Sequence, residues 1–128
     1  MRLLLDTHVL LWALASPKQL GKDARAAIED PANEVLFSAA SIWEIAIKAS
    51  LKRTDFRVSP AQIAVAALDS GFKELPVHSA AAGHTAKLPA HHRDPFDRLL
   101  IAQAVTEPAV FYTADAQLEV YSDLVRRI

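Results

Sequence analysis

Short apolar runs alternate along this chain with longer segments that mix apolar and polar residues. The runs Leu3–Leu5, Val35–Phe37 and Val110–Thr113 are brief and almost wholly apolar, which is typical of strands covered on both faces. We expect a further strand at Glu74–Val77 and a strand at the sheet edge at Leu124–Ile128. Uniformly apolar strands of this length indicate a parallel sheet.

Helix patterns fill the segments between these strands. Ser59 followed by Pro60 is a favourable N-cap and first helical position. The helices are expected at residues 7–15, 21–30, 39–51, 60–71, 79–87, 95–106 and 116–121. The segment 39–51 is apolar almost all round, so we expect other elements to cover it. Alternating strands and helices in 128 residues predict one domain, residues 1–128, with a three-layer α/β/α sandwich around a central parallel sheet.

Four acidic residues lie where these apolar segments end or turn. Asp6 follows the first strand, Asp115 lies just past the strand that ends at Thr113, Asp97 lies in the first turn of a helix, and Glu44 lies within a helix. Ligands of parallel sheets bind beyond the carboxyl ends of the strands. The predicted topology can therefore bring distant acids to one edge of the sheet.

Each aspartate also has a local explanation. Asp6 and Asp115 could cap the helices that follow them, since Asp is a favoured N-cap. Asp94, followed by Pro95, is expected to cap the next helix, with Asp97 at the third position as in a capping box. Capping alone would account for these residues one by one.

Glu44 is harder to explain locally. It could pair with Lys48 at i,i+4, an interaction worth only about 0.3–0.5 kcal/mol. Yet its helix has little solvent-facing surface, so a buried carboxylate there needs a partner. Two carboxylates about 5 Å apart repel by roughly 3 kcal/mol at an effective dielectric constant near 20. A cluster of four would need protonation or cations, and four oxygen ligands suit Mg²⁺ or Mn²⁺.

Composition and charge narrow the classes of function. Lys and Arg number 14 and Asp and Glu 15, a net charge of −1, which argues against a passive, charge-driven nucleic-acid coat. Without the four acids the remaining charge is about +3, compatible with an anionic substrate. The chain has no cysteine, an acid at the sixth position and no apolar run near 20 residues. We therefore expect a cytoplasmic protein without a signal peptide or membrane span.

Four sequence blocks, taken in order, resemble those of the PIN domain, and specifically of VapC-type ribonuclease toxins. The blocks are Leu5–His8, Ser38–Ile45, Arg93–Ala104 and Thr113–Asp115, and the resemblance covers the whole chain. It implies the α/β/α fold and Mg²⁺- or Mn²⁺-dependent endonucleolytic cleavage of RNA, with one or two ions. It also implies a homodimer that is silenced by a cognate VapB-like antitoxin, which places a basic side chain among the acids.

The resemblance assigns roles to particular side chains. Asp6, Glu44, Asp97 and Asp115 match the acidic quartet that holds metal and carries catalysis, Asp115 being the position most variable in role. Asp94 is assigned to capping. Thr7 and Thr113 could orient a water or a metal ligand. The basic residues that could contact RNA phosphates are Lys48, Lys52, Arg93 and Arg98.

Other side chains carry weaker signals. The five histidines lack the i,i+4 spacing of a helical zinc site, although His8 or His92 could touch a phosphate. Trp12 and Trp43 lie in expected helices, where core or interface positions are commoner than base-stacking platforms. Lys48 and Lys52 are expected to share one helical face with Glu44.

Other interpretations of the chain fit less well. A phospho-receiver domain would need paired acids at the first strand and a lysine ending the last core strand, where Thr113 stands. A haloacid-dehalogenase-like phosphatase would need an acid in place of His8. The alternative that stays open is a catalytically degenerate PIN-like module that binds RNA or protein without cutting.

Overall fold

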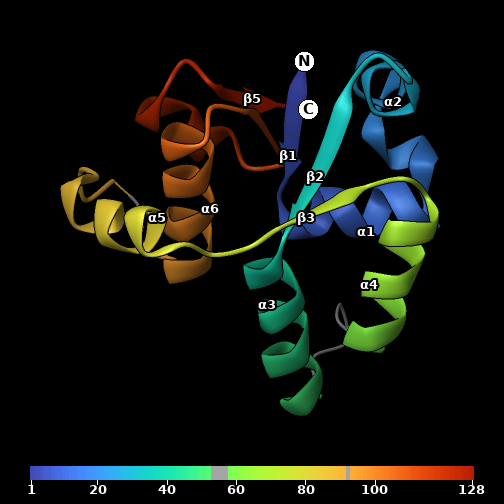
Figure 1. The fold of residues 1–128 in the computed structure, drawn as a ribbon, viewed down its shortest axis with the longest axis horizontal. Coiled ribbons are helices and arrows are strands. Elements are labelled where there is room, and N and C mark those ends of the chain that lie inside the picture. Colours follow the sequence, from blue (N-terminus) through green and yellow to red (C-terminus); the bar gives the residue numbers. More distant parts are fainter. Residues whose placement is uncertain (53–57, 92) are drawn as a thin grey trace.

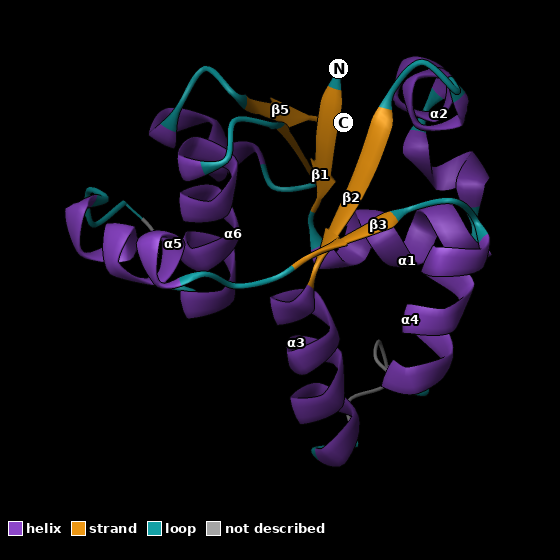
Figure 2. Ribbon diagram, in the orientation of Figure 1, coloured by secondary structure: helices purple, strands orange, loops and turns teal. Residues whose placement is uncertain are grey.

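A five-stranded parallel sheet forms the centre of the molecule (Figures 1 and 2). The structure is a computed structural model and describes residues 1–52, 58–91 and 93–128. The strands are β1 (Arg2–Leu5), β2 (Glu34–Ser38), β3 (Lys73–Leu75), β4 (Val110–Thr113) and β5 (Val125–Arg127). They lie in the order β3-β2-β1-β4-β5 and every neighbouring pair is parallel. The expected fold class is confirmed, and β5 is an edge strand as predicted.

Helices cover both faces of this sheet. They are α1 (Thr7–Ala15), η1 (Pro17–Leu20), α2 (Lys22–Glu29), α3 (Ala39–Ser50), α4 (Pro60–Asp69), α5 (Ser79–His84), η3 (Thr85–Lys87), α6 (Pro95–Thr106) and η4 (Ala116–Tyr121). Side chains of a strand alternate between faces, so Leu3 and Leu5 pack in the core under α1, α2 and α4, while Leu4 packs in the core under α6 and η4. Figure 1 shows these two helical layers on opposite sides of the strands.

A buried polar link ties α6 to the sheet. Ser38, at the end of β2, donates a 2.6 Å hydrogen bond to Gln103 of α6, and the Gln103 amide donates to the carbonyl of Pro76 at 3.2 Å.

Since α6 leads directly into β4, the C-terminus of α6 lies at the amino edge of the sheet. A 12-residue helix is about 18 Å long, so its N-terminal turn reaches the carboxyl edge.

Three details differ from the sequence expectations. The strand β3 ends at Leu75 rather than at residue 77, because Pro76 has no N–H to continue the ladder. The helix α3 is not covered all round, since Trp43 is 60% exposed. Lys52 does not share a helical face with Glu44, because α3 ends at Ser50 and Lys52 has a positive φ of 57°.

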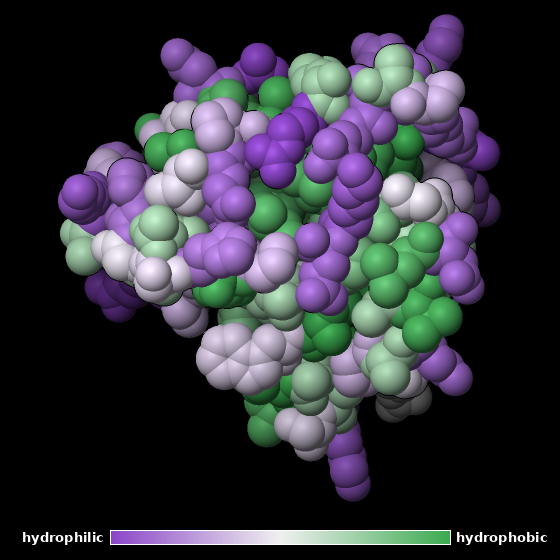
Figure 3. Space-filling view, viewed as in Figure 1, coloured by the Kyte–Doolittle hydropathy of each residue, from purple (hydrophilic) through white to green (hydrophobic). Residues whose placement is uncertain are grey.

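The surface over α4 carries apolar side chains, Val65 and Leu68 among them (Figure 3). Within the described ranges, no helix has the length and apolar character that crossing a membrane requires.

Candidate active site

Asp6 lies at the carboxyl end of the central strand β1 and is only 6% exposed. Its backbone N–H continues the sheet ladder by donating to the Tyr112 carbonyl at 2.9 Å. Its Oδ1 accepts from the Val9 N–H at 2.8 Å, which caps α1 as predicted. Its Oδ2 accepts from the Thr113 hydroxyl at 2.6 Å and from the Ala114 N–H at 3.2 Å. Both carboxylate oxygens are thus held by uncharged donors.

This environment makes ionisation of Asp6 costly. Burial raises the pKa of the Asp6 carboxyl above its ordinary value of 3.8. The hydrogen bonds from Thr113, Val9 and Ala114 favour the charged form and offset part of the rise. The charge of His8 acts in the same direction and has a smaller effect. Among the described residues the hydrogen-bond donors to its carboxylate are uncharged, so Asp6 is a buried acid with a raised pKa, a condition that is common at functional sites.

Thr113 connects Asp6 to Asp115. The Thr113 side chain is fully buried at the end of β4. Its Oγ1 donates to Asp6 and accepts from the Asp115 N–H at 3.0 Å. Asp115 is half-buried and caps η4 through its Oδ1, which accepts from the Gln117 N–H at 2.9 Å. The local capping role predicted for Asp115 is confirmed, and one hydroxyl links two of the four acids.

Glu44 is 4% exposed and is held quite differently. Its Oε1 accepts from the Thr7 hydroxyl at 2.6 Å, and its Oε2 pairs with the Lys48 ammonium at 2.5 Å. Ser41 Oγ lies 3.0 Å from Thr7 Oγ1. Because Thr7 has one hydroxyl proton and the carboxylate can only accept it, Ser41 is the donor to Thr7. The i,i+4 pair considered from the sequence exists, whereas no local pattern had singled out Ser41 as a participant.

Asp97 lies in the first turn of α6, at the same edge of the sheet. Asp94 caps this helix as predicted, its Oδ1 accepting from the N–H groups of Phe96 at 2.8 Å and Asp97 at 3.2 Å. The ring of Phe96 contacts that of Trp43 in an edge-on arrangement with centroids 5.3 Å apart. The residues preceding Asp97 and Glu44 are therefore in contact across α6 and α3.

The four acids thus come from elements that end or begin at one edge, but their oxygens do not already form a metal cage. In the part of the chain that the structure describes, no three acidic or histidine side chains form a group that could hold an ion. Asp6 is followed by Thr7, whose hydroxyl donates to Glu44. The Thr113 hydroxyl donates to Asp6 and accepts from the Asp115 N–H.

The basic residues expected to contact RNA have different surroundings. Lys48 pairs with Glu44, whereas Lys52 and Arg93 are exposed. Arg98 donates to the backbone carbonyls of Thr85, Leu88 and Pro89 and to the Tyr121 hydroxyl, at 2.8–3.3 Å. It therefore fastens the segment after α5 to α6, a role that was not anticipated. Contact of these residues with RNA stays a prediction, and His92 lies outside the described residues.

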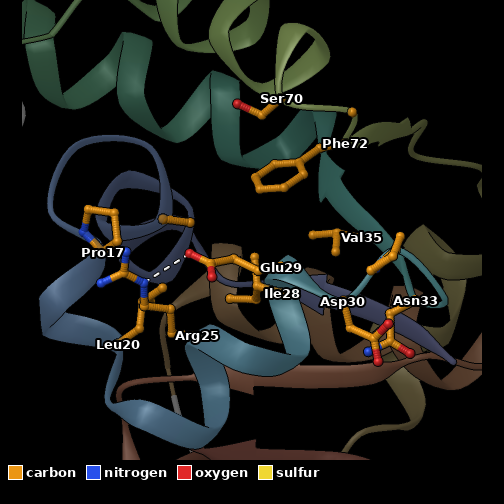
Figure 4. Close-up of a pocket in the computed structure, with 13 residues that line it drawn as sticks. Pro17, Leu20, Arg25, Ile28, Glu29, Asp30, Asn33, Val35, Ser70 and Phe72 are labelled. Carbon is orange, nitrogen blue, oxygen red and sulfur yellow. Dashed lines mark hydrogen bonds and ion pairs between the residues drawn. The ribbon is translucent and has the colours of Figure 1, made fainter.

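A hollow of about 510 Å³ lies at the opposite, amino edge of the sheet (Figure 4). Val35 and Phe72 supply apolar walls, and the charged groups on its rim include Arg25 and Glu29, which form an ion pair at 2.9 Å. None of the four acids lines it. The candidate chemistry is therefore at the other end of the strands.

Comparison with known proteins identifies the family. The model of the PIN domain matches residues 3–124. The chain belongs to the PIN-domain family. No curated protein matches this PIN domain in sequence. Among solved structures it is similar to a chain of VapBC2 from Rickettsia felis, in a crystal structure of that complex bound to a DNA fragment from its promoter. The TM-score is 0.66 at 15% identity, over 99% of this chain and 98% of that chain, so the likeness is one of fold.

The acids of this PIN domain fit a hard divalent cation in kind and lie toward one edge of the sheet, although among the described residues no three of them are grouped closely enough to hold an ion. All candidate ligands are carboxylate oxygens, which Mg²⁺ and Mn²⁺ prefer. The buried Asp6 carboxylate has a raised pKa and only uncharged hydrogen-bond donors among the described residues, so such an ion would stabilise its charged form. Glu44 already has a cation in Lys48. An ion that used both acids would therefore compete with the Lys48 ammonium.

Proposed function

We propose that this chain is a Mg²⁺- or Mn²⁺-dependent endoribonuclease of the VapC type, acting as the toxin of a toxin–antitoxin pair. The observation that carries the proposal is the buried Asp6 carboxylate, whose hydrogen-bond donors among the described residues are all uncharged, at a sheet edge shared with three further acids. Membership of the PIN family and the fold shared with a chain of a VapBC complex support it.

In this proposal the acidic side chains hold the ion and two hydroxyls orient the acids. A bound divalent ion would neutralise the acids and activate a water for in-line attack on an RNA phosphodiester. Asp6, Glu44 and Asp97 are proposed to hold this ion, with Asp115 assisting. Thr113 fixes Asp6 and Thr7 fixes Glu44 by hydrogen bonds of 2.6 Å each, so the two hydroxyls keep these carboxylates oriented.

The proposed partners follow from the same site. An acidic edge that already accommodates the Lys48 ammonium beside Glu44 is suited to a basic side chain of a VapB-like antitoxin, and a guanidinium would form stronger, bidentate hydrogen bonds there. We further propose a homodimer and a cytoplasmic location, as expected from the sequence.

The decisive experiment compares Asp6→Asn with the wild-type protein on single-stranded RNA in Mn²⁺. Replacing a metal ligand is expected to lower cleavage at least about 100-fold, beyond the usual loss for an outer-shell residue. Folding should be retained, because Asn keeps an oxygen for the Val9 N–H. Asp30→Asn, an exposed aspartate that caps a turn through Ala32, is the matched control and should cleave normally. Wild-type-like cleavage by Asp6→Asn would overturn the assignment.

A second candidate is a PIN module that binds RNA or protein without cutting. The observation in its favour is the Glu44–Lys48 pair, which neutralises one predicted ligand without metal. Titration of Mn²⁺ into the protein separates the two candidates. A nuclease should bind Mn²⁺ and degrade RNA in proportion to occupancy, whereas a degenerate module should show RNA affinity that is indifferent to the ion.

A further inference from the structure

Lys48 lies at the boundary between a buried acid and solvent. Its ammonium is 2.5 Å from Oε2 of Glu44, whose side chain is 5% exposed, while 18% of the Lys48 side chain remains exposed. The helix α3 begins directly after β2 and so runs outward from the carboxyl edge of the sheet (Figure 1). Four residues of helix advance about 6 Å, so the Lys48 backbone lies farther from this edge than that of Glu44. The Lys48 side chain thus connects the buried carboxylate with the solvent outside the edge.

The two oxygens of Glu44 are held by different kinds of group. Oε1 accepts from the Thr7 hydroxyl at 2.6 Å, and Ser41 donates to Thr7 at 3.0 Å. Thr7 and Ser41 are both buried and belong to α1 and α3, so their hydroxyls would keep the carboxylate in place if the ammonium left. The partner of Oε2 is the end of a flexible lysine side chain. Oε2 is therefore the oxygen that can exchange partners.

A divalent ion and the ammonium exclude each other at this oxygen. Mg²⁺ binds an oxygen ligand at about 2.1 Å, and the Lys48 ammonium lies 2.5 Å from the same atom. The two cations would then be less than about 5 Å apart, where like charges repel strongly inside a protein. Binding of the ion to Glu44 therefore requires Lys48 to move, and the exposed side of Lys48 gives its ammonium a path toward solvent.

We infer that Lys48 exchanges between two partners, the Glu44 carboxylate and a phosphate of the RNA strand; the inference rests on the proposed ribonuclease function. While Lys48 is on Glu44, it stabilises the buried acid and lowers the affinity of the site for a divalent ion. Once the ion holds Glu44, the ammonium is available to a phosphate. Ion and RNA then favour each other's binding, because the RNA draws away the ammonium that competes with the ion.

Chemical labelling of lysines follows the ammonium directly in the wild-type protein. An amine-reactive reagent is applied at constant pH with and without Mg²⁺, and the modified peptides are measured by mass spectrometry. Mg²⁺ should raise the labelling rate of Lys48 several-fold and leave that of Lys22, an exposed residue of α2, unchanged. If calorimetry shows that Mg²⁺ binds while the labelling of Lys48 stays the same, Lys48 does not leave Glu44 and the inference is wrong.

The affinity of the protein for Mn²⁺, measured by calorimetry without RNA, tests the competition. Lys48→Met should bind Mn²⁺ about 10-fold more tightly than the wild type, as expected if the pair is closed in roughly nine of ten wild-type molecules. Lys48→Arg should bind Mn²⁺ more weakly, because a guanidinium can form two hydrogen bonds with a carboxylate. Lys22→Met is the control and should match the wild type.

Lys48→Arg keeps a cation beside Glu44, so it decides the matter even if Lys48→Met does not fold. Affinity of Lys48→Arg for Mn²⁺ equal to or above that of the wild type would contradict the competition.

The contact with phosphate is measured from RNA cleavage at saturating Mn²⁺. Loss of one contact should raise the KM of Lys48→Met for single-stranded RNA several-fold. It should also reduce the slope of log KM against log salt concentration by about 0.7, the value for one phosphate of a single strand. A merely structural role would lower kcat and leave the slope unchanged, and that result would exclude the phosphate as a partner.

Failure of this inference can be told apart from failure of the proposed function. If the wild type binds Mn²⁺ and cleaves RNA while Lys48 shows neither the labelling change nor the shift in salt dependence, the exchange is wrong and the nuclease assignment stands. If the wild type neither binds Mn²⁺ nor cleaves RNA, both are wrong.

Discussion

Asp6 and Glu44 are buried to almost the same degree, 6% and 4% exposed, but the chain stabilises them by opposite means. Asp6 is surrounded by a hydroxyl and two backbone N–H groups. Glu44 has a hydroxyl and the full positive charge of Lys48. Hydrogen bonds from neutral groups leave the pKa of Asp6 raised, whereas Lys48 supplies Glu44 with a counter-charge from within its own helix.

The comparison shows where a divalent ion would be most needed and where it would be opposed. At Asp6 an ion would relieve the cost of a buried charge. At Glu44 it would first have to displace an ammonium group that lies 2.5 Å from the carboxylate. The Asp6 and Glu44 halves of the acidic edge should therefore respond differently to mutation and to metal.

The largest stability effect is expected from Lys48→Met, which removes the charge and keeps the length of the side chain. Glu44 would then be buried with the Thr7 hydroxyl but without its cation. Breaking a fully buried pair costs about 3–5 kcal/mol, and because Lys48 has 18% of its side chain exposed we expect about 2–3 kcal/mol in EDTA. Urea unfolding measures this loss, and Mn²⁺ should restore more stability to the variant than it adds to the wild type.

Arg25→Met is the control for that experiment. Arg25 and Glu29 form another i,i+4 pair, with side chains 49% and 61% exposed. Exposed helix pairs contribute about 0.3–0.5 kcal/mol, and Mn²⁺ should not change the result. Equal losses for the two variants would mean that Lys48 does not serve as the counter-charge of a buried site.

A somewhat smaller effect is expected from Thr113→Val, which preserves shape and removes the hydroxyl. Asp6 would lose its 2.6 Å donor, and the Asp115 N–H would lose its acceptor. Substitutions of residues that orient ligands typically reduce activity 10- to 100-fold. Kinetics of RNA cleavage at saturating Mn²⁺ measure the effect, and Thr113→Ser should recover most of it. A full loss in Thr113→Ser would point to packing of the methyl group instead.

Local signals in the sequence were sufficient for most of the fold. Apolar runs located β1, β2 and β4, and the Asp94–Pro95 start signal located α6, because capping and burial on both faces depend on neighbouring residues. The cap roles of Asp6 and Asp115 followed in the same way. The meeting of β1 and β4 at one edge required only the rules of parallel topology.

The environment of the site could not be found in this way. Whether the Trp43 side chain is buried depends on how α5 and α6 pack against α3. The apolar pattern of α3 alone does not tell which of its faces is exposed to solvent. The bond from Ser38 to Gln103 joins residues 65 positions apart, so no local pattern contains it. From the sequence, Lys48 could either pair with Glu44 or contact an RNA phosphate. The side-chain conformations of the packed neighbours place its ammonium beside Glu44 in the ligand-free structure.

The pH dependence of stability should reveal the cost of ionising the buried Asp6 carboxyl. A carboxyl whose pKa is raised on folding binds more protons in the native state, so its contribution is fully present below the ordinary pKa of 3.8 and is lost as pH rises through the raised pKa. Asp6→Asn cannot ionise and escapes this loss. In EDTA, the melting temperature of Asp6→Asn relative to the wild type should therefore increase as pH rises from about 4, and level off above the folded pKa of Asp6. A difference that stays constant with pH would show that the Asp6 carboxyl ionises as easily in the folded protein as in the unfolded chain, and burial would then not oppose its charge.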